Sequence, residues 1–117
     1  MRWLPIFPNE TAARPVMERL ALLDTRLLGV YLHRFPATGG RPIIPGHDHP
    51  WGFVSVVLAG GYDEASCWCH ETPHRRGHCG LRRARAVHRI RVHPDGCLTL
   101  CIRGPKRQDW SWQRLPK

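Results

Sequence analysis

The sequence lacks any run of about 18 apolar residues, and this absence excludes a transmembrane helix. Its first ten residues, MRWLPIFPNE, contain no continuous apolar segment of the kind that a signal peptide needs. We therefore expect a cytoplasmic protein that does not associate with a membrane.

Lysine and acidic residues are scarce. The chain carries 18 Lys and Arg against 9 Asp and Glu, a formal net charge of +9, and only two of the cations are lysines. No acidic residue lies between Glu71 and Asp95, whereas this stretch holds Arg75, Arg76, Arg82, Arg83, Arg85, Arg89 and Arg91. Such a run indicates either an anionic partner (phosphate, carboxylate, acidic protein or nucleic acid) or a solvated basic loop, and charge alone does not choose between them.

The chain also lacks the even number of cysteines that a complete set of disulfide bonds requires. The chain has 5 cysteines, and an odd number in a chain without an export signal argues for reduced thiols over a disulfide framework. Cys97 and Cys101 share parity within an apolar, strand-like run. We predict that both are core side chains.

The length and the glycine and proline content of the chain favour many short strands. The length of 117 residues fits one domain, and 11 Gly and 11 Pro favour turns over long helices. We predict strands at residues 3–7, 30–35, 53–58, 62–68, 86–92, 97–102 and 110–112, turns at 59–61 and 94–96, and loops at 36–46 and 70–83. One helix is predicted within residues 11–24, because Val16, Leu20 and Leu23 keep helical spacing. The pattern predicts a small all-β sandwich or barrel.

The segment His47-Asp48-His49 is the strongest indication of a functional site in the sequence. His47 and His49 are two residues apart, so on a strand their imidazoles project from the same face. Neutral imidazole is the commonest protein ligand for transition metals. His88, in a second alternating segment, supplies a third imidazole, and three such ligands leave positions open for water or substrate.

A rival cluster of metal ligands lies in the predicted loop: Cys67, Cys69, His70, His74, His78 and Cys79. Its Cys-x-Cys pair has a single spacer, whereas structural zinc sites usually use about two to four. We therefore favour an exposed loop rich in histidine and cysteine.

The segments HDHPWGFVSVVLAGGY, AVHRI and TLCIRGPKRQDWSW resemble the cupin superfamily, and in particular small single-domain cupins. Gly40, His47, His49 and Gly60 match the first cupin motif, and His88 corresponds to the histidine of the second. The resemblance covers about residues 30–112. It implies a double-stranded β-helix, or jelly roll, within a single domain over 1–117, with 1–29 as an N-terminal strand and helix extension.

The resemblance also implies a metal. The metal-binding glutamate of the family falls at Phe53, so the implied site has three histidines, His47, His49 and His88. It would hold one divalent ion, Fe(II) or Zn(II), with Mn or Ni as further options. Beside it we expect Glu64 and Tyr62 as catalytic residues, and Trp51, Phe53, Arg34 and Arg85 as substrate-binding residues.

These features lead to three hypotheses. The first is a metal-dependent enzyme that acts on a small anionic or polar metabolite, as a dioxygenase-type oxidoreductase or as a Lewis-acid lyase or isomerase. The second is a non-catalytic module that binds a metal or small ligand. The third is a basic nucleic-acid-binding protein, disfavoured because the tryptophans lie apart from the arginine run. We further expect a homodimer, because the edge strand at 3–7 exposes apolar side chains.

Overall fold

The computed structural model describes residues 2–7, 12–67, 70–109, 111 and 115. Within them the chain forms strands and no helix, so no helix there could cross a membrane. The strands are β1 (Leu4–Ile6), β2 (Met17–Asp24), β3 (Gly29–Phe35), β4 (Ile43–His47), β5 (Phe53–Cys67), β6 (His70–Arg75), β7 (Cys79–Arg82) and β8 (His88–Arg103). The all-β class predicted from the sequence is confirmed.

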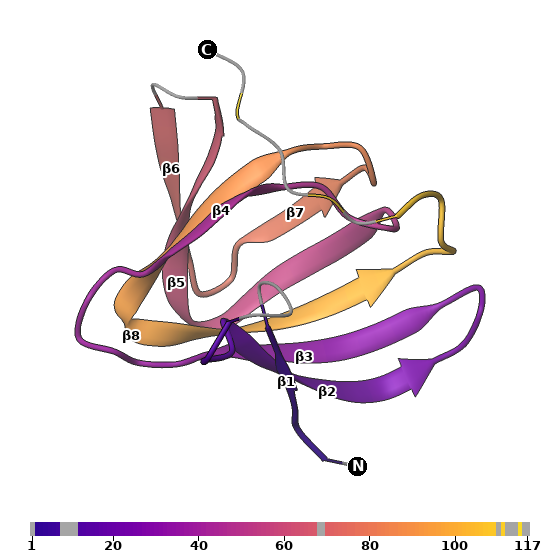
Figure 1. Cartoon of the computed structure of the whole chain (residues 1–117), viewed down its shortest axis with the longest axis horizontal. Coiled ribbons are helices and arrows are strands. Elements are labelled where there is room, and N and C mark those ends of the chain that lie inside the picture. Colours follow the sequence, from indigo (N-terminus) through magenta and orange to yellow (C-terminus); the bar gives the residue numbers. More distant parts are fainter. Residues whose placement is uncertain (1, 8–11, 68–69, 110, 112–114, 116–117) are drawn as a thin grey trace.

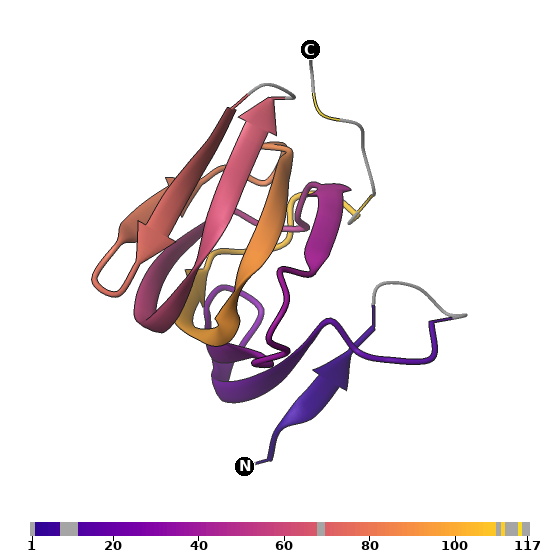
Figure 2. The ribbon, with the colours of Figure 1, turned by 90° about the vertical axis from the view of Figure 1, so that its left-hand side faces the viewer.

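The eight strands form one antiparallel sheet that β5 and β8 fold into two layers. These two long strands run side by side through the molecule (Figure 1). In the larger layer, the first half of β5 and the second half of β8 join β7, β3, β2 and β1. In the smaller layer, the other halves join β4 and β6 (Figure 2). The result is the predicted sandwich.

Two glycines sit where β5 and β8 pass between the layers. Gly60 has a φ of +67°, and a Cβ there would lie 2.0 Å from the carbonyl oxygen of Gly96. Gly96 has a φ of +80°, and a Cβ there would lie 2.5 Å from the carbonyl oxygen of Phe35. The turns predicted at 59–61 and 94–96 are therefore wrong: both are bends within continuous strands. Glycine at positive φ serves a turn and a bend equally well, so the sequence signal is the same.

The helix predicted within 11–24 is wrong for the described residues, because Met17–Asp24 forms β2. Each side of β2 has a partner: Arg19 lies opposite Leu4 of β1 and opposite His33 of β3. The helical spacing of the apolar residues is outweighed by pairing on both sides, as happens when local propensity is weak. The strand predicted at 3–7 is present as β1, at the edge of the sheet.

The two predicted loops also contain strands. Residues 36–46 include the start of β4, and residues 70–83 include β6 and β7. Their proline and histidine content hid the pairing of β6 and β7 with β5. The strand predicted at 110–112 lies outside the described residues, except for Ser111.

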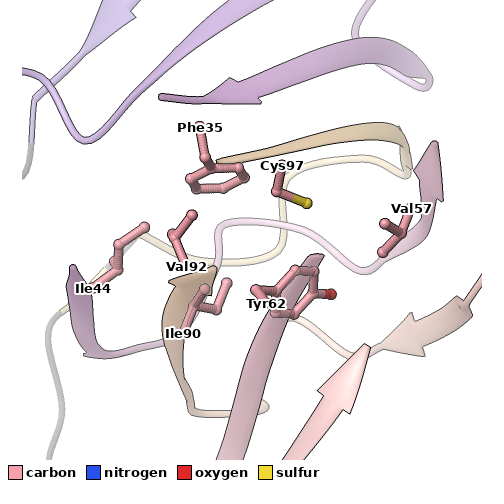
Figure 3. Close-up of a cluster of buried hydrophobic side chains, with 7 residues drawn as sticks. All are labelled: Phe35, Ile44, Val57, Tyr62, Ile90, Val92 and Cys97. Atoms are coloured by element: carbon pink, nitrogen blue, oxygen red, sulfur yellow. The ribbon is translucent and has the colours of Figure 1, made fainter. Parts of the chain in front are cut away.

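The main core lies between the two layers (Figure 3). Its side chains come from both: Phe35, Val57 and Cys97 from the larger layer, and Ile44, Tyr62, Ile90 and Val92 from the smaller. Burial raises the pKa of the Cys97 thiol to about 12 and that of Cys101 to about 11. Both thiols are free, so the prediction of reduced core cysteines is confirmed for this pair.

Candidate metal centre

Three imidazoles converge at one end of the sandwich. His47 ends β4 and lies directly opposite His88, which begins β8. The ring centroids are separated by 4.7 Å (His47–His88), 4.8 Å (His47–His49) and 4.9 Å (His49–His88). One potential ligand atom from each residue lies within 4.8 Å of the others. Across the described ranges, these three side chains are the one such group of metal ligands.

His49 reaches the cluster from a loop, because β4 ends at His47. The backbone nitrogen of His49 donates to the carbonyl oxygen of Ala84 at 3.0 Å. Asp48 projects the other way: its carboxylate accepts hydrogen bonds from the backbone nitrogen of Ser111 at 2.8 Å and from Gln108 Nε2 at 3.0 Å. The C-terminal segment thereby fixes the loop that presents His49.

Hydrogen bonds set the orientation of two of the rings. His47 Nδ1 lies 2.7 Å from the carbonyl oxygen of Pro45, and His88 Nδ1 lies 2.5 Å from Glu64 Oε2. With the proton on Nδ1, each ring keeps its lone pair on Nε2. His88 Nε2 and His49 Nδ1 are buried and have no hydrogen-bond partner in the described part of the chain. Buried nitrogens without a partner are rare, and a metal ion would satisfy them.

Burial keeps two of the three imidazoles, His47 and His49, uncharged. Desolvation, followed by the neighbouring His88, lowers the pKa of His47 to about 4. The same two causes lower the pKa of His49 to about 2. Both rings are therefore neutral at pH 7, which is the form that binds metals.

Glu64 lies behind His88 and not on the cavity wall. Its carboxylate accepts hydrogen bonds from His88, from His74 Nε2 at 2.9 Å and from Arg82 Nε at 3.0 Å, with a second contact from Arg82 Nη2. Burial alone would raise the pKa of Glu64, but these donors outweigh it and hold the pKa well below its usual range. Both oxygens of Glu64 are thus engaged by His88, His74 and Arg82, and the catalytic role expected for this residue stays a prediction.

A cavity of about 320 Å³ opens onto the three imidazoles. Trp51 stacks on His49 with centroids 5.8 Å apart, and Phe53 meets the same ring edge-on at 4.6 Å. Tyr62 also lines the cavity, and burial raises the pKa of its phenol, so its hydroxyl stays protonated. Of the predicted side chains, Trp51 and Phe53 thus contact His49, and Tyr62 lines the same cavity.

The two predicted substrate-binding arginines lie elsewhere. Arg34 Nη2 pairs with Glu18 at 2.9 Å, and its guanidinium covers the ring of Trp3 on the outer surface. Arg85 is exposed and is not among the residues that line the cavity. Strand alternation turns Arg34 outward, and Arg85 precedes β8 in a segment that does not cross the cavity.

Two ionisable residues of the cavity escaped the sequence analysis, Arg19 of β2 and His33 of β3. They are cross-strand partners, and Arg19 Nε donates to His33 Nε2 at 2.9 Å. Period-two alternation along 30–35 could have placed His33 on the same face as Tyr31 and Phe35. Arg19 was hidden because its segment was predicted as a helix.

Several of the other histidines and arginines contact one another or pair with carboxylates. His74 binds Glu64 and stacks on His78, with centroids 3.6 Å apart. Arg89 and Arg91 both lie beside Glu71, at 3.6 and 3.2 Å. Cys69 of the rival cluster falls outside the described residues. Part of the basic run is therefore neutralised within the protein, which weakens the nucleic-acid hypothesis.

No protein-family model matches the sequence, and no curated protein matches it. Several solved structures, in contrast, match the structure of this chain. The DMSP lyase DddQ from Ruegeria pomeroyi aligns with a TM-score of 0.75 and 15% identity, over 96% of this chain and 60% of that one. KdgF from a Halomonas species aligns with a TM-score of 0.65 and 15% identity, over 92% and 90% of the two chains.

A cupin superfamily protein from Desulfitobacterium hafniense aligns over its whole length and over 91% of this chain, with a TM-score of 0.63 and 12% identity. Likeness at such identities shows a shared fold, and the present chain spans less than two thirds of the DMSP lyase. The cupin fold that the motifs imply is thereby confirmed.

Proposed function

The chain has the cupin fold, and from this premise we propose that it is a small metal-dependent enzyme acting on a small anionic or polar metabolite. One divalent ion would be held by His47, His49 and His88. The observation that carries the proposal is the convergence of three imidazoles on one cavity, with two of their buried nitrogens lacking a hydrogen-bond partner among the described residues.

The donor set suits Zn(II) or Fe(II), and Mn and Ni remain options, because imidazole binds all of these ions. When bound, the metal would supply Lewis acidity or, as iron, the capacity for oxygen chemistry. One similar structure is a lyase by name, which favours the lyase or isomerase branch over an oxygenase.

The side chains around the ion would divide the remaining work. Glu64 would hold the proton on His88 Nδ1 and so keep Nε2 available. Trp51 and Phe53 would shield the site from water. Tyr62, which stays protonated, would donate a hydrogen bond from its hydroxyl to a bound substrate.

The first test is metal content. We expect about one divalent ion per chain, with metal–nitrogen distances of about 2.0–2.2 Å by X-ray absorption. His49→Ala should abolish binding, whereas His70→Ala, which removes an exposed histidine of β6, should leave the metal content unchanged. Full metal occupancy in His49→Ala would refute the assignment.

We further propose that the protein is a homodimer that pairs through the outer face of the larger layer. On this face, apolar residues that are cross-strand partners form two rows, and each row runs across five strands. Partners in register share one face of a sheet, so each row lies on a single face. One row is Leu81, Val54, Ile102, Val30 and Leu23, and the other is Cys79, Val56, Leu100, Leu32 and Leu20. The rows carry no charge, which matters because two copies of a chain with a net charge of +9 repel each other elsewhere.

A further inference from the structure

One permanently charged side chain lines the cavity. Arg19 of β2 shares the wall with the three imidazoles, and no aspartate or glutamate is among the described residues that line it. The nearby acid Glu18 points outward and pairs with Arg34. A partly buried guanidinium that faces a cavity without a carboxylate is a site for an external anion.

The contacts of Arg19 fix the position of its side chain and leave the two terminal guanidinium nitrogens available to a ligand. Nε donates to His33 Nε2 at 2.9 Å, and Cζ lies 4.5 Å from the ring centroid of Tyr31 and 5.9 Å from that of Trp51. The terminal nitrogens Nη1 and Nη2 have no hydrogen-bond partner in the described segments. Partial burial lowers the pKa of Arg19, a cost that a bound anion would offset.

Arg19 and the expected metal ligand His49 both lie close to one aromatic ring. Trp51 is 5.9 Å from Arg19 Cζ and 5.8 Å from the ring centroid of His49. A molecule lying along Trp51 can therefore reach both the guanidinium and the imidazoles. The cavity wall beside Arg19 is apolar, and it is formed by Ile6, Phe7, Val16 and Met17.

We propose that Arg19 binds the carboxylate of a small carboxylic acid whose apolar or aromatic body lies along Trp51. The two terminal nitrogens match the two oxygens of a carboxylate in a bidentate pair. The other end of the molecule would reach the metal, and in this respect the inference rests on the proposed function. Arg19 thus determines specificity for an acid over its neutral analogue.

The test uses phenylacetate as the probe and phenylacetamide as its uncharged counterpart, with binding measured by calorimetry before and after loading with Zn(II). Wild-type protein should bind the acid at least about tenfold more tightly than the amide, and Arg19→Gln should weaken phenylacetate binding by about 10- to 100-fold. Arg34→Gln, which alters an exposed arginine of the adjacent strand, should bind as wild type.

Arg19→Lys is a second variant for the case in which Arg19→Gln does not fold. It keeps the positive charge but loses the paired terminal nitrogens of the guanidinium, so we expect it to bind phenylacetate several-fold more weakly than wild type. Equal affinity for acid and amide, wild-type affinity in the folded Arg19 variant, or no binding of phenylacetate at millimolar concentration would each overturn the inference. Metal analysis of the same samples separates the two proposals: Arg19-dependent binding in a protein that takes up no metal would support this inference and refute the metal centre.

Discussion

Glu64 shows how a single residue can govern a site from which it is set back. Its carboxylate lies 2.5 Å from His88 Nδ1 and is itself held by His74 and Arg82. A carboxylate in this position orients the imidazole and raises its basicity as a ligand.

Replacement of that carboxylate should therefore weaken metal binding without removing a ligand. We expect Glu64→Gln to lower the affinity for Zn(II) by about 10- to 100-fold in a competition with a chelator. Glu71→Gln, which alters a carboxylate paired with Arg89 and Arg91, serves as the control. Unchanged affinity in Glu64→Gln would mean that His88 needs no such support.

His33 makes a prediction about pH. Burial, followed by the charge of Arg19, lowers its pKa from 6.5 to about 3. Below pH 6.5 the unfolded chain therefore binds a proton at this position that the folded protein does not, so the free energy of unfolding falls as the pH drops towards 3.

Between pH 7 and pH 5 this single group should cost about 2 kcal/mol of stability. His33→Asn removes this titratable group. The free energy of unfolding of the variant, measured with urea, should therefore fall by about 2 kcal/mol less than that of wild type between pH 7 and pH 5. Identical pH dependence in the two proteins would show that His33 titrates normally in the folded state.

At the scale of elements, β5 and β8 decide the architecture, because each contributes to both layers. Their bends need glycine for two reasons, positive φ and lack of space: a Cβ at Gly60 would meet a carbonyl oxygen of β8 at 2.0 Å. Gly39 offers a matched comparison, since its φ is +75° and a Cβ there would meet nothing within 4 Å.

Gly39→Ala should cost only the backbone strain of about 1–3 kcal/mol in the free energy of unfolding. Gly60→Ala should cost clearly more, because the main chains of β5 and β8 must also move apart. Urea or thermal unfolding of the two variants measures the difference. Equal losses would show that the close approach at Gly60 is easily relieved.

At the scale of the whole molecule, the outer face of the larger layer provides the test of the homodimer. Leu81 in one of its apolar rows is 73% exposed, so a charge at this position should be tolerated by the monomer but not at an interface. In sedimentation or light scattering at micromolar concentration, we expect a dimer for wild type and a monomer for Leu81→Glu.

Leu27→Glu is the control, because Leu27 is 71% exposed in the connection between β2 and β3 and lies outside both rows. This variant should remain dimeric. A monomeric wild type would rule out the dimer, and a dimeric Leu81→Glu would direct attention to the edge strand β1.

The sequence by itself determined the features that depend on local spacing. Short apolar segments separated by glycine and proline were sufficient to predict the all-β class, and the spacing of His47 and His49 with a third histidine at His88 was sufficient to predict the three-imidazole cluster. These signals lie within short stretches of sequence and do not depend on which strands are neighbours.

Only the tertiary structure decided what depends on strand pairing. It turned the segment around Arg19 into β2, and thereby placed a guanidinium opposite His33 and on the cavity wall. It also placed the carboxylate of Glu64 against the Nδ1 atom of His88, 24 residues away in the sequence. Pairing energies between distant strands outweigh local helical spacing, and no periodicity within one segment records them.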